Sequence, residues 1–167
     1  YVVAVPILTG LTDRIAAKKI IILSMLLAFF STLGYALTAD GLWSAGFWRL
    51  LNGASFAGTY MPGLKVLSDI IPEQHRSRAV AVYSTSYPLG ASLSFFLTGE
   101  LESAYGWETA FMLLSIGPLI GLVLILVSLP SRKTVVSTQT SHMFDFRPAL
   151  RKQRALAYMI AYGIHNG

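Results

Sequence analysis

The sequence predicts an all-α, polytopic membrane helix bundle, because its charge is low and its apolar runs are long. Of the 167 residues, 54% are hydrophobic and 13% are charged, whereas a soluble domain carries about 25% charged residues. Residues 20–38 and 109–129 contain no charged side chain, and about 20 apolar residues cross the hydrocarbon layer as a helix. Each run is therefore expected to span the membrane, since a helix satisfies its backbone hydrogen bonds internally. A buried helix of a large soluble protein is the weaker alternative, because several such runs occur in one short chain.

Six helices are expected in chain order, each from an apolar run that ends in polar residues. Residues 1–10 and 20–38 are apolar throughout and are separated by a charged stretch. Residues 43–65 and 79–99 carry more polar side chains at a helical repeat, and a polar continuation of the first reaches Asp69. The remaining two helices are residues 108–129 and a segment from about residue 155 onward. The connecting segments are residues 11–19, 39–41, 70–78, 100–107 and 130–154.

Basic residues are concentrated on one side of the expected bundle. Of the 13 Lys and Arg residues, three lie in 11–19, two in 70–78 and six in 130–154, while the turns 39–41 and 100–107 contain none. Loops rich in Lys and Arg stay on the cytoplasmic side, so the first three segments are expected to be cytoplasmic. This topology also explains the net charge of +5, and no nucleic-acid partner is expected.

The composition gives no sign of a metal or cofactor site. The chain has no cysteine, which excludes disulfides and thiolate ligands. Its three histidines, His75, His142 and His165, lack the spacing of metal ligands. The helices between residues 20 and 129 contain no cluster of His, Asp and Glu that could form a catalytic site. We therefore expect no cofactor, no metal and no enzymatic activity.

Three of the expected helices carry a polar stripe on one face. At about 100° per residue, the helix over 43–65 aligns Arg49, Asn52, Gly53, Phe56, Tyr60 and Gly63. The helix over 79–99 aligns Tyr83, Ser86, Tyr87, Gly90 and Ser94, and the last segment aligns Tyr158, Tyr162 and His165. Polar groups at membrane depth usually face a cavity or a partner. Close helix packing is the alternative, because Gly53-x3-Ala57, Ala54-x3-Gly58 and Gly117-x3-Gly121 are pairs of small residues that allow helices to approach.

Arg49 is the sharpest single candidate for a functional residue. It lies about six residues inside the outer end of its helix, or about 9 Å deep at 1.5 Å per residue. Its long side chain could reach the outer headgroups, and Trp43 and Trp48 flank this end as in an interfacial belt. Alternatively, Arg49 shares a face with Asn52 and is buried as a functional cation.

Two stretches resemble the signatures of the major facilitator superfamily. Residues 10–19 are similar to the loop signature G-x-x-x-D-R-x-G-x-[RK]-[RK] between helices 2 and 3 of that family. The residues that carry this similarity are Asp13, Arg14, Lys18 and Lys19. Arg49-x-x-Asn52-Gly53 resembles the second signature, R-x-x-[QN]-G, in helix 4. Thr9 and Ala16 stand where the loop signature has glycine, and Ser86-Tyr-Pro88-Leu-Gly90 replaces the G-x3-G-P pattern of the proton antiporters.

The resemblance extends in order over essentially the whole chain and implies its organisation. Residues 1–129 would hold the N-terminal half from the end of helix 2 to helix 6. Residues 130–154 would form the cytoplasmic central loop, and residues 155–167 the truncated start of helix 7. Ser131 to Ser141, rich in Ser, Thr and Gln, is expected to be poorly ordered.

The family resemblance implies secondary active transport of a small solute by alternating access, coupled to protons. Because Arg49 is a lone basic residue at membrane depth, an organic or inorganic anion is the expected substrate. The family reading assigns conformational control to Asp13, Arg14, Lys18, Lys19, Asp69, Arg76 and Arg78. The candidates for substrate or coupling contacts are Arg49, Asn52, Tyr60, Tyr83, Ser86, Tyr87 and His165. The expected setting is the bilayer of a bacterial inner membrane, with the protein as a monomer.

Two alternatives to this function stay open at the level of sequence. A multidrug or metabolite exporter of the same family would use the same fold, although the missing antiporter pattern disfavours it. A sensor built on the transporter fold would bind a solute without moving it across the membrane.

Overall fold

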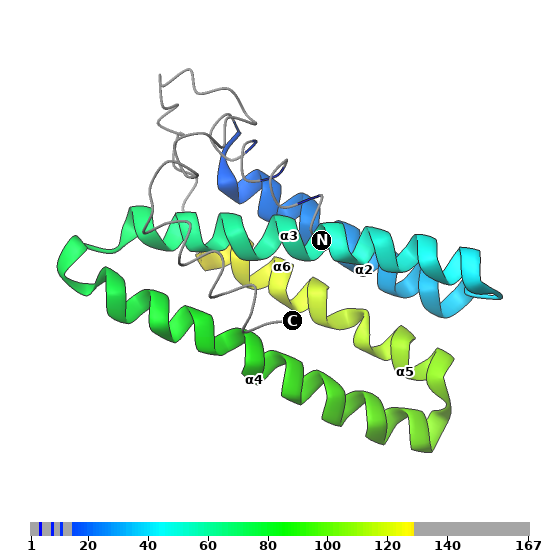
Figure 1. Cartoon of the computed structure of the whole chain (residues 1–167). Helices are drawn as coiled ribbons and strands as arrows, with labels where there is room; N and C mark the ends of the chain where they lie inside the picture. The colour runs from blue at the N-terminus through cyan, green and yellow to red at the C-terminus, as the bar shows by residue number, and fades with distance from the viewer. Residues whose placement is uncertain (1–3, 5–7, 9–10, 12–14, 129–167) are drawn as a thin grey trace, which may run out of the picture. The chain divides into compact units, whose positions relative to one another are not determined.

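The computed structural model describes residues 4, 8, 11 and 15–128, and all the regular structure in them is helical (Figure 1). The helices are α2 (Ala17–Thr38), α3 (Leu42–Ile70), α4 (Glu73–Tyr105), α5 (Trp107–Leu114) and α6 (Ile116–Ser128). They belong to one compact unit, Tyr1–Val136. The all-helical fold class predicted from the sequence is confirmed. The expectations for residues 130–154, for the helix from 155 with His165, and for Asp13 and Arg14 lie outside the described residues.

Two helical segments are long and apolar enough to cross a membrane, namely Ala17–Thr38 and Trp107–Ser128. Each has 22 residues, or about 33 Å of helix at 1.5 Å per residue, which matches a hydrocarbon layer about 30 Å thick. The first contains the charge-free run 20–38, and the second contains nearly all of the charge-free run 109–129. α3 and α4 also exceed this length, but they carry the polar stripes.

The second apolar segment is broken, whereas the sequence predicted one continuous helix over 108–129. α5 ends at Leu114 and α6 begins at Ile116. Pro118 has no backbone N–H to donate to the carbonyl of Leu114, so the regular ladder is interrupted there. The buried Ser115 at the break donates its Oγ hydrogen to the Met112 carbonyl at 2.6 Å.

The connection over 39–41 has the predicted extent, whereas the other described connections are shorter than the sequence predicted. α2 begins at Ala17, so Lys18 and Lys19 are helical, and α4 begins at Glu73, so Arg76 and Arg78 are helical. The expected loops over 11–19 and 70–78 are therefore wrong in extent. A charged run marks where a helix leaves the membrane, and an exposed helix continues in water beyond that point.

Pro72 and Gly106 set the two ends of α4. Pro72 precedes the first turn with φ −55°, an angle that its ring imposes and that a helix start accepts. Glu73 in the first turn favours the positive helix N-terminus. Gly106 follows Tyr105 with φ 80°, a conformation that glycine adopts without a steric penalty. The expected turn over 100–107 therefore shrinks to this single residue.

α2 is the central element of the described bundle. It packs against α3, α5 and α6, while α4 packs against α5 and α3. Gly58 of α3 lies against Ser24 of α2, and Gly121 of α6 lies against Met25 of α2, so these two glycines allow the close approach that the small-residue pairs predict. Gly117 has open space around it, so the prediction is wrong for that position.

Candidate solute pocket between α3 and α4

The polar stripes of α3 and α4 meet at an open pocket of about 410 Å³. α3 and α4 are consecutive and antiparallel, joined by Ile71 and Pro72 (Figure 1), so their facing residues line a common space. The lining residues are Phe56, Thr59 and Tyr60 from α3 and Tyr83, Ser86, Tyr87, Gly90, Ala91 and Ser94 from α4. Four of the predicted contact residues, Tyr60, Tyr83, Ser86 and Tyr87, thus lie on one pocket.

Four aromatic rings form the wall of this pocket. Phe56 and Tyr60 are one turn apart on α3, and their rings are stacked with centroids 6.0 Å apart. The Tyr60 ring lies 5.3 Å from Tyr83 and 6.3 Å from Tyr87, and the Phe56 ring lies 5.4 Å from Tyr87. All four separations fall in the range of favourable aromatic pairs. This aromatic cluster joins the polar faces of the two helices.

Several hydroxyl groups of the pocket donate to backbone carbonyls. Tyr83 Oη donates to the Tyr60 carbonyl across the helix pair at 2.9 Å. Ser86 Oγ donates to the Tyr83 carbonyl at 2.6 Å, and Thr59 Oγ1 donates to the Ser55 carbonyl at 2.9 Å. Gly63 makes room for the Tyr83 hydroxyl, because a Cβ at that position would collide with it. Gly63 of the α3 stripe therefore allows Tyr83 of the α4 stripe to pack against α3.

Each of the two helices that line the pocket contains a proline and continues through it. Pro62 lies in α3 and is fully buried, and Pro88 lies in α4 next to Tyr87. Since proline has no backbone N–H, the carbonyls of Gly58 and Ser84 lose their usual intrahelical partners. Such interruptions in membrane helices are tolerated where nearby groups satisfy the backbone.

Arg49 and Asn52 lie outside this pocket, although the sequence places them on the same stripe as Tyr60. Asn52 Nδ2 donates to Ser31 Oγ at 3.3 Å and to Thr32 Oγ1 at 3.1 Å, both on α2. Arg49 is exposed, so the prediction of a buried cation is wrong for the described part of the chain, and its guanidinium lies over the Tyr35 ring at 4.5 Å and the Phe111 ring at 5.2 Å. The α3 stripe is thus divided between α4 on one side and α2 with α5 on the other.

The aromatic partners of Arg49 were not predicted from the sequence. Tyr35 and Phe111 lie in the two runs that contain no charged residue, residues 20–38 and 109–129. Their rings are 5.0 Å apart, and the Trp107 ring lies 6.0 Å from Tyr35. The available signal was the charge of Arg49 itself, because aromatic ring faces attract a guanidinium.

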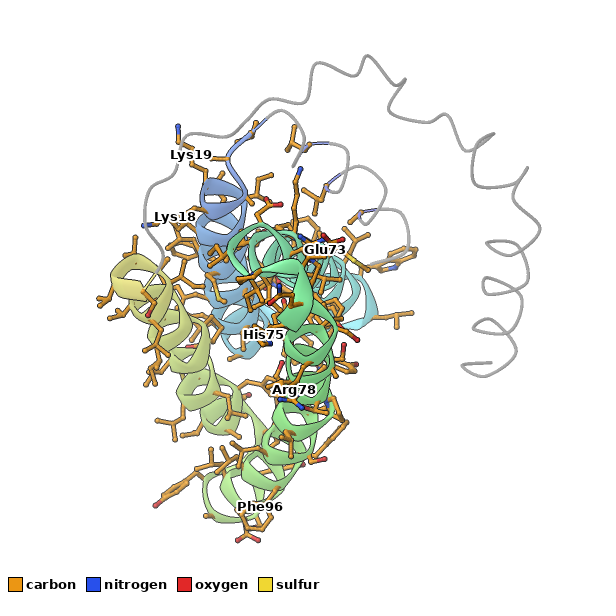
Figure 2. All side chains as sticks on the ribbon, turned by 90° about the vertical axis from the view of Figure 1, so that its left-hand side faces the viewer. Lys18, Lys19, Glu73, His75, Arg78 and Phe96 are labelled. Atoms are coloured by element: carbon orange, nitrogen blue, oxygen red, sulfur yellow. The ribbon has the colours of Figure 1, made fainter. Side chains whose placement is uncertain are left out.

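The predicted conformational residues that the structure describes lie at one end of the helices. α2 and α3 are antiparallel, so the start of α2 with Lys18 and Lys19 lies on the side where α3 ends at Asp69. Figure 2 looks onto this end and also shows Glu73 and Arg78 on the first turns of α4. Asp69, Arg76 and Arg78 are exposed.

No group of three or more His, Cys, Asp or Glu side chains within residues 15–128 could hold a metal ion. The pocket lining is aromatic and hydroxylic. It is suited to holding a small molecule through ring contacts and hydrogen bonds.

Two apolar spans beside helices with polar, pocket-lining faces indicate an integral membrane protein. The model of the Major Facilitator Superfamily matches residues 1–166. The chain belongs to this superfamily, and the resemblance noted in the sequence is confirmed.

Relatives with named activities include two bacterial transporters of aromatic acids. The chain is 33% identical over 119 residues to the 4-hydroxybenzoate transporter PcaK of Acinetobacter baylyi, covering 71% of this chain and 26% of that protein. It is 26% identical over 142 residues to the gallate transporter of Pseudomonas putida, covering 84% and 31% respectively.

A third relative is named for antibiotic resistance. The chain is 36% identical over 108 residues to the methylenomycin A resistance protein of Streptomyces coelicolor, covering 62% of this chain and 22% of that protein. The chain thus spans about a quarter of the length of the curated relatives it matches. No solved structure gives a significant match.

Proposed function

We propose that the protein is a secondary active transporter of small organic anions that works by alternating access and is coupled to protons. The observation that carries this proposal is the α3–α4 pocket, which polar stripes form within a chain of the Major Facilitator Superfamily. In many transporters the substrate lies near the bilayer midplane between helices that rock about it. The protein performs no covalent chemistry on its substrate in this mechanism, so it is not an enzyme.

The relatives support an organic acid as the substrate. Two of them are named for the transport of 4-hydroxybenzoate and gallate, which are carboxylates at neutral pH. We propose an organic acid of this kind as the substrate of this chain as well. The matched segments are 26% and 31% of the two relatives.

Arg49 is the proposed cationic contact for the anion or for a coupling carboxylate. Tyr35 and Phe111 engage the guanidinium through their ring faces, and stacking occupies the flat face of an arginine. The five N–H donors point outward in the plane of the fork. Stacking on the two rings therefore orients the donors without consuming them, which suits a residue that receives a carboxylate.

The charged end of the helices is the proposed cytoplasmic gate. Lys18, Lys19, Asp69, Arg76 and Arg78 lie at the ends of α2, α3 and α4, and Asp13 and Arg14 precede them in the sequence. Ion pairs among such helix ends would form in one conformation and break in the other. The setting we propose is a bacterial inner membrane, with this end in the cytoplasm and a monomeric transporter.

Export of a toxic compound is the second candidate function. The observation that favours it is the similarity to the methylenomycin A resistance protein. Direction of transport separates the two candidates, since the pocket itself is compatible with both. A sensor that binds its solute without moving it would show neither uptake nor export.

Flux measurements on the intact protein in proteoliposomes test the proposal. Radiolabelled 4-hydroxybenzoate is offered with and without a pH gradient, and we expect accumulation that a protonophore abolishes. Arg49→Ala is expected to abolish this uptake. Arg49→Lys is expected to retain part of it, because lysine keeps the positive charge but lacks the planar guanidinium with its five N–H donors. Normal uptake in both variants would remove Arg49 from the proposed site. Binding without flux in the wild type would instead identify a sensor.

A further inference from the structure

The Arg49 guanidinium lies where side chains of α2, α3 and α5 meet. Arg49 is an exposed residue of α3, and its Cζ is 4.5 Å from the centre of the Tyr35 ring of α2 and 5.2 Å from that of the Phe111 ring of α5. Both distances are within the limit of about 6 Å for a cation–π interaction. Among the described residues, no acid and no hydrogen-bond acceptor pairs with this guanidinium, so its position depends on the two rings.

The two rings are themselves fixed by packing. Their centroids are 5.0 Å apart, and the Tyr35 ring also lies 6.0 Å from the Trp107 ring of α5. Trp107 and Phe111 are four residues apart and therefore share a face of α5. Ala36 beside Tyr35 and Ala110 beside Phe111 are buried, and α2 packs against α5. Each ring thus projects from a backbone that is held in place.

A guanidinium held in this way is prepared for an anion. The long side chain of an arginine has many rotamers, and ordering it at the moment of binding costs free energy. Stacking over two rings removes this freedom before the anion arrives, while the N–H donors stay available in the plane of the guanidinium. The rings therefore raise the affinity of Arg49 for an anion without touching the anion themselves.

We propose that Tyr35 and Phe111 are positioning residues, whose ring faces hold the Arg49 guanidinium so that it receives the carboxylate of the transported anion. Neither residue lines the α3–α4 pocket, and neither lies on a predicted polar stripe. This inference rests on the proposed transport of organic anions and adds the residues that set the affinity of Arg49 for its anion.

Uptake of radiolabelled 4-hydroxybenzoate by the intact protein in proteoliposomes measures the contribution of each ring. Phe111→Leu and Tyr35→Leu keep an apolar side chain but remove a ring face. Each is expected to raise KM about twofold to fivefold, with a maximal rate near that of the wild type. Tyr35→Phe and Phe111→Tyr keep the ring face and should keep the wild-type KM. A KM in Tyr35→Phe as high as in Tyr35→Leu would overturn the proposal, since the hydroxyl and not the ring face would then act.

Two controls separate positioning from a general effect on packing. Trp107→Leu removes another ring that contacts Tyr35 but leaves both rings at Arg49 in place, so KM should change less than in Phe111→Leu. The neutral 4-hydroxybenzamide lacks the carboxylate, so it should inhibit uptake equally well in the wild type and in Phe111→Leu. Equal effects of the two leucine variants, or equal weakening of the acid and the amide, would show a packing role alone and refute positioning.

Fluorinated phenylalanines at position 111 test the ring face with little change in packing. Each added fluorine withdraws electrons from the ring and weakens the attraction of its face for a cation. KM is expected to rise stepwise from phenylalanine to its monofluoro and trifluoro forms. The same series at Phe30 of α2, whose ring pairs with Phe29 and not with Arg49, should leave KM unchanged. An unchanged KM throughout the series at position 111 would rule out the cation–π contribution.

A measurement without substrate keeps this inference separate from the proposed function. NMR relaxation of the side-chain nitrogen gives the order parameter of the Arg49 Nε–H bond, and the signal is assigned by its absence in Arg49→Lys. The order parameter should fall in Phe111→Leu and stay unchanged in Trp107→Leu. This result without any uptake by the wild type would support positioning and refute the proposed transport. Uptake with the same KM and the same order parameter in Phe111→Leu would refute positioning and leave transport standing.

Discussion

Replacing Gly34 by alanine tests how tightly α2 and α3 are packed. A Cβ at Gly34 would lie 2.5–2.7 Å from three carbons of the Trp48 indole, closer than real Cβ contacts allow. The indole cannot simply move away, because its Nε1 donates to Thr38 Oγ1 at 2.8 Å. Thr38 Oγ1 in turn donates to the Gly34 carbonyl at 2.8 Å. The collision must therefore displace a helix or break the indole hydrogen bond.

Three contributions set the expected magnitude for Gly34→Ala. Overpacking costs about 1–3 kcal/mol, and loss of the Trp48 hydrogen bond costs about 1 kcal/mol. Alanine recovers about 1 kcal/mol through its higher helix propensity. The net expectation is a loss of about 1–3 kcal/mol in the free energy of unfolding. Gly46→Ala is the matched control, since Gly46 lies in α3 with nothing within 4 Å of the new Cβ, and it should gain up to about 1 kcal/mol.

Unfolding of the intact protein in mixed micelles by increasing detergent, followed by circular dichroism, measures these differences. Each glycine variant is also made in a Trp48→Ala background, where the Gly34→Ala penalty should disappear. The coupling between Gly34 and Trp48 is expected to be about 1–3 kcal/mol, as for other residues in contact. Equal stabilities of the Gly34 and Gly46 variants would refute the tight packing of Gly34 against Trp48. So would a loss of stability in Gly34→Ala that is unchanged when the indole is removed.

Three further predictions follow from the same structure and sequence. Asn52→Leu should lower the free energy of unfolding by about 1–3 kcal/mol, because two α2 hydroxyls lose their donor; equal stability of the variant and the wild type in micelles would contradict this. Reporter fusions at Ala39 and Ser103 should appear outside and one at Gln74 inside; a cytoplasmic signal at Ser103 would overturn the topology. Asp13→Asn should reduce flux while the amount of inserted protein stays near normal, and unchanged activity would show that Asp13 only occupies a turn.

Helical periodicity alone identified most of the pocket. The spacing of Tyr60 on one helix and of Tyr83, Ser86 and Tyr87 on the next places each set on one face, whatever the rest of the chain does. Two consecutive helices joined by a two-residue connection then bring these faces together. The apolar spans could also be predicted from the sequence, because a long run without charged residues is stable in an apolar environment and not in water.

The ends of the helices were harder to predict. Hydropathy indicates which residues lie in the apolar layer, but a helix can continue beyond that layer into water. Glu73, Arg76 and Arg78 favour water, and they are exposed on a helix that continues beyond the apolar run. The break at Ser115 was not predicted, because Ile116, Gly117 and Pro118 keep the segment as apolar as its neighbours. Pro118 was the available signal, since proline cannot donate the backbone hydrogen bond that a continuous helix requires there.

The helical repeat fixes which residues share a face of α3, whereas the packing of the helices fixes which neighbouring helix each of them meets. A helical face is wide enough to border two other helices. Tyr60 turns toward α4, whereas Asn52 on the same stripe hydrogen-bonds to α2. Arg49 lies over rings from α2 and α5. This choice depends on where small residues such as Gly58 let α3 approach α2, a property of two packed surfaces that no single helix contains.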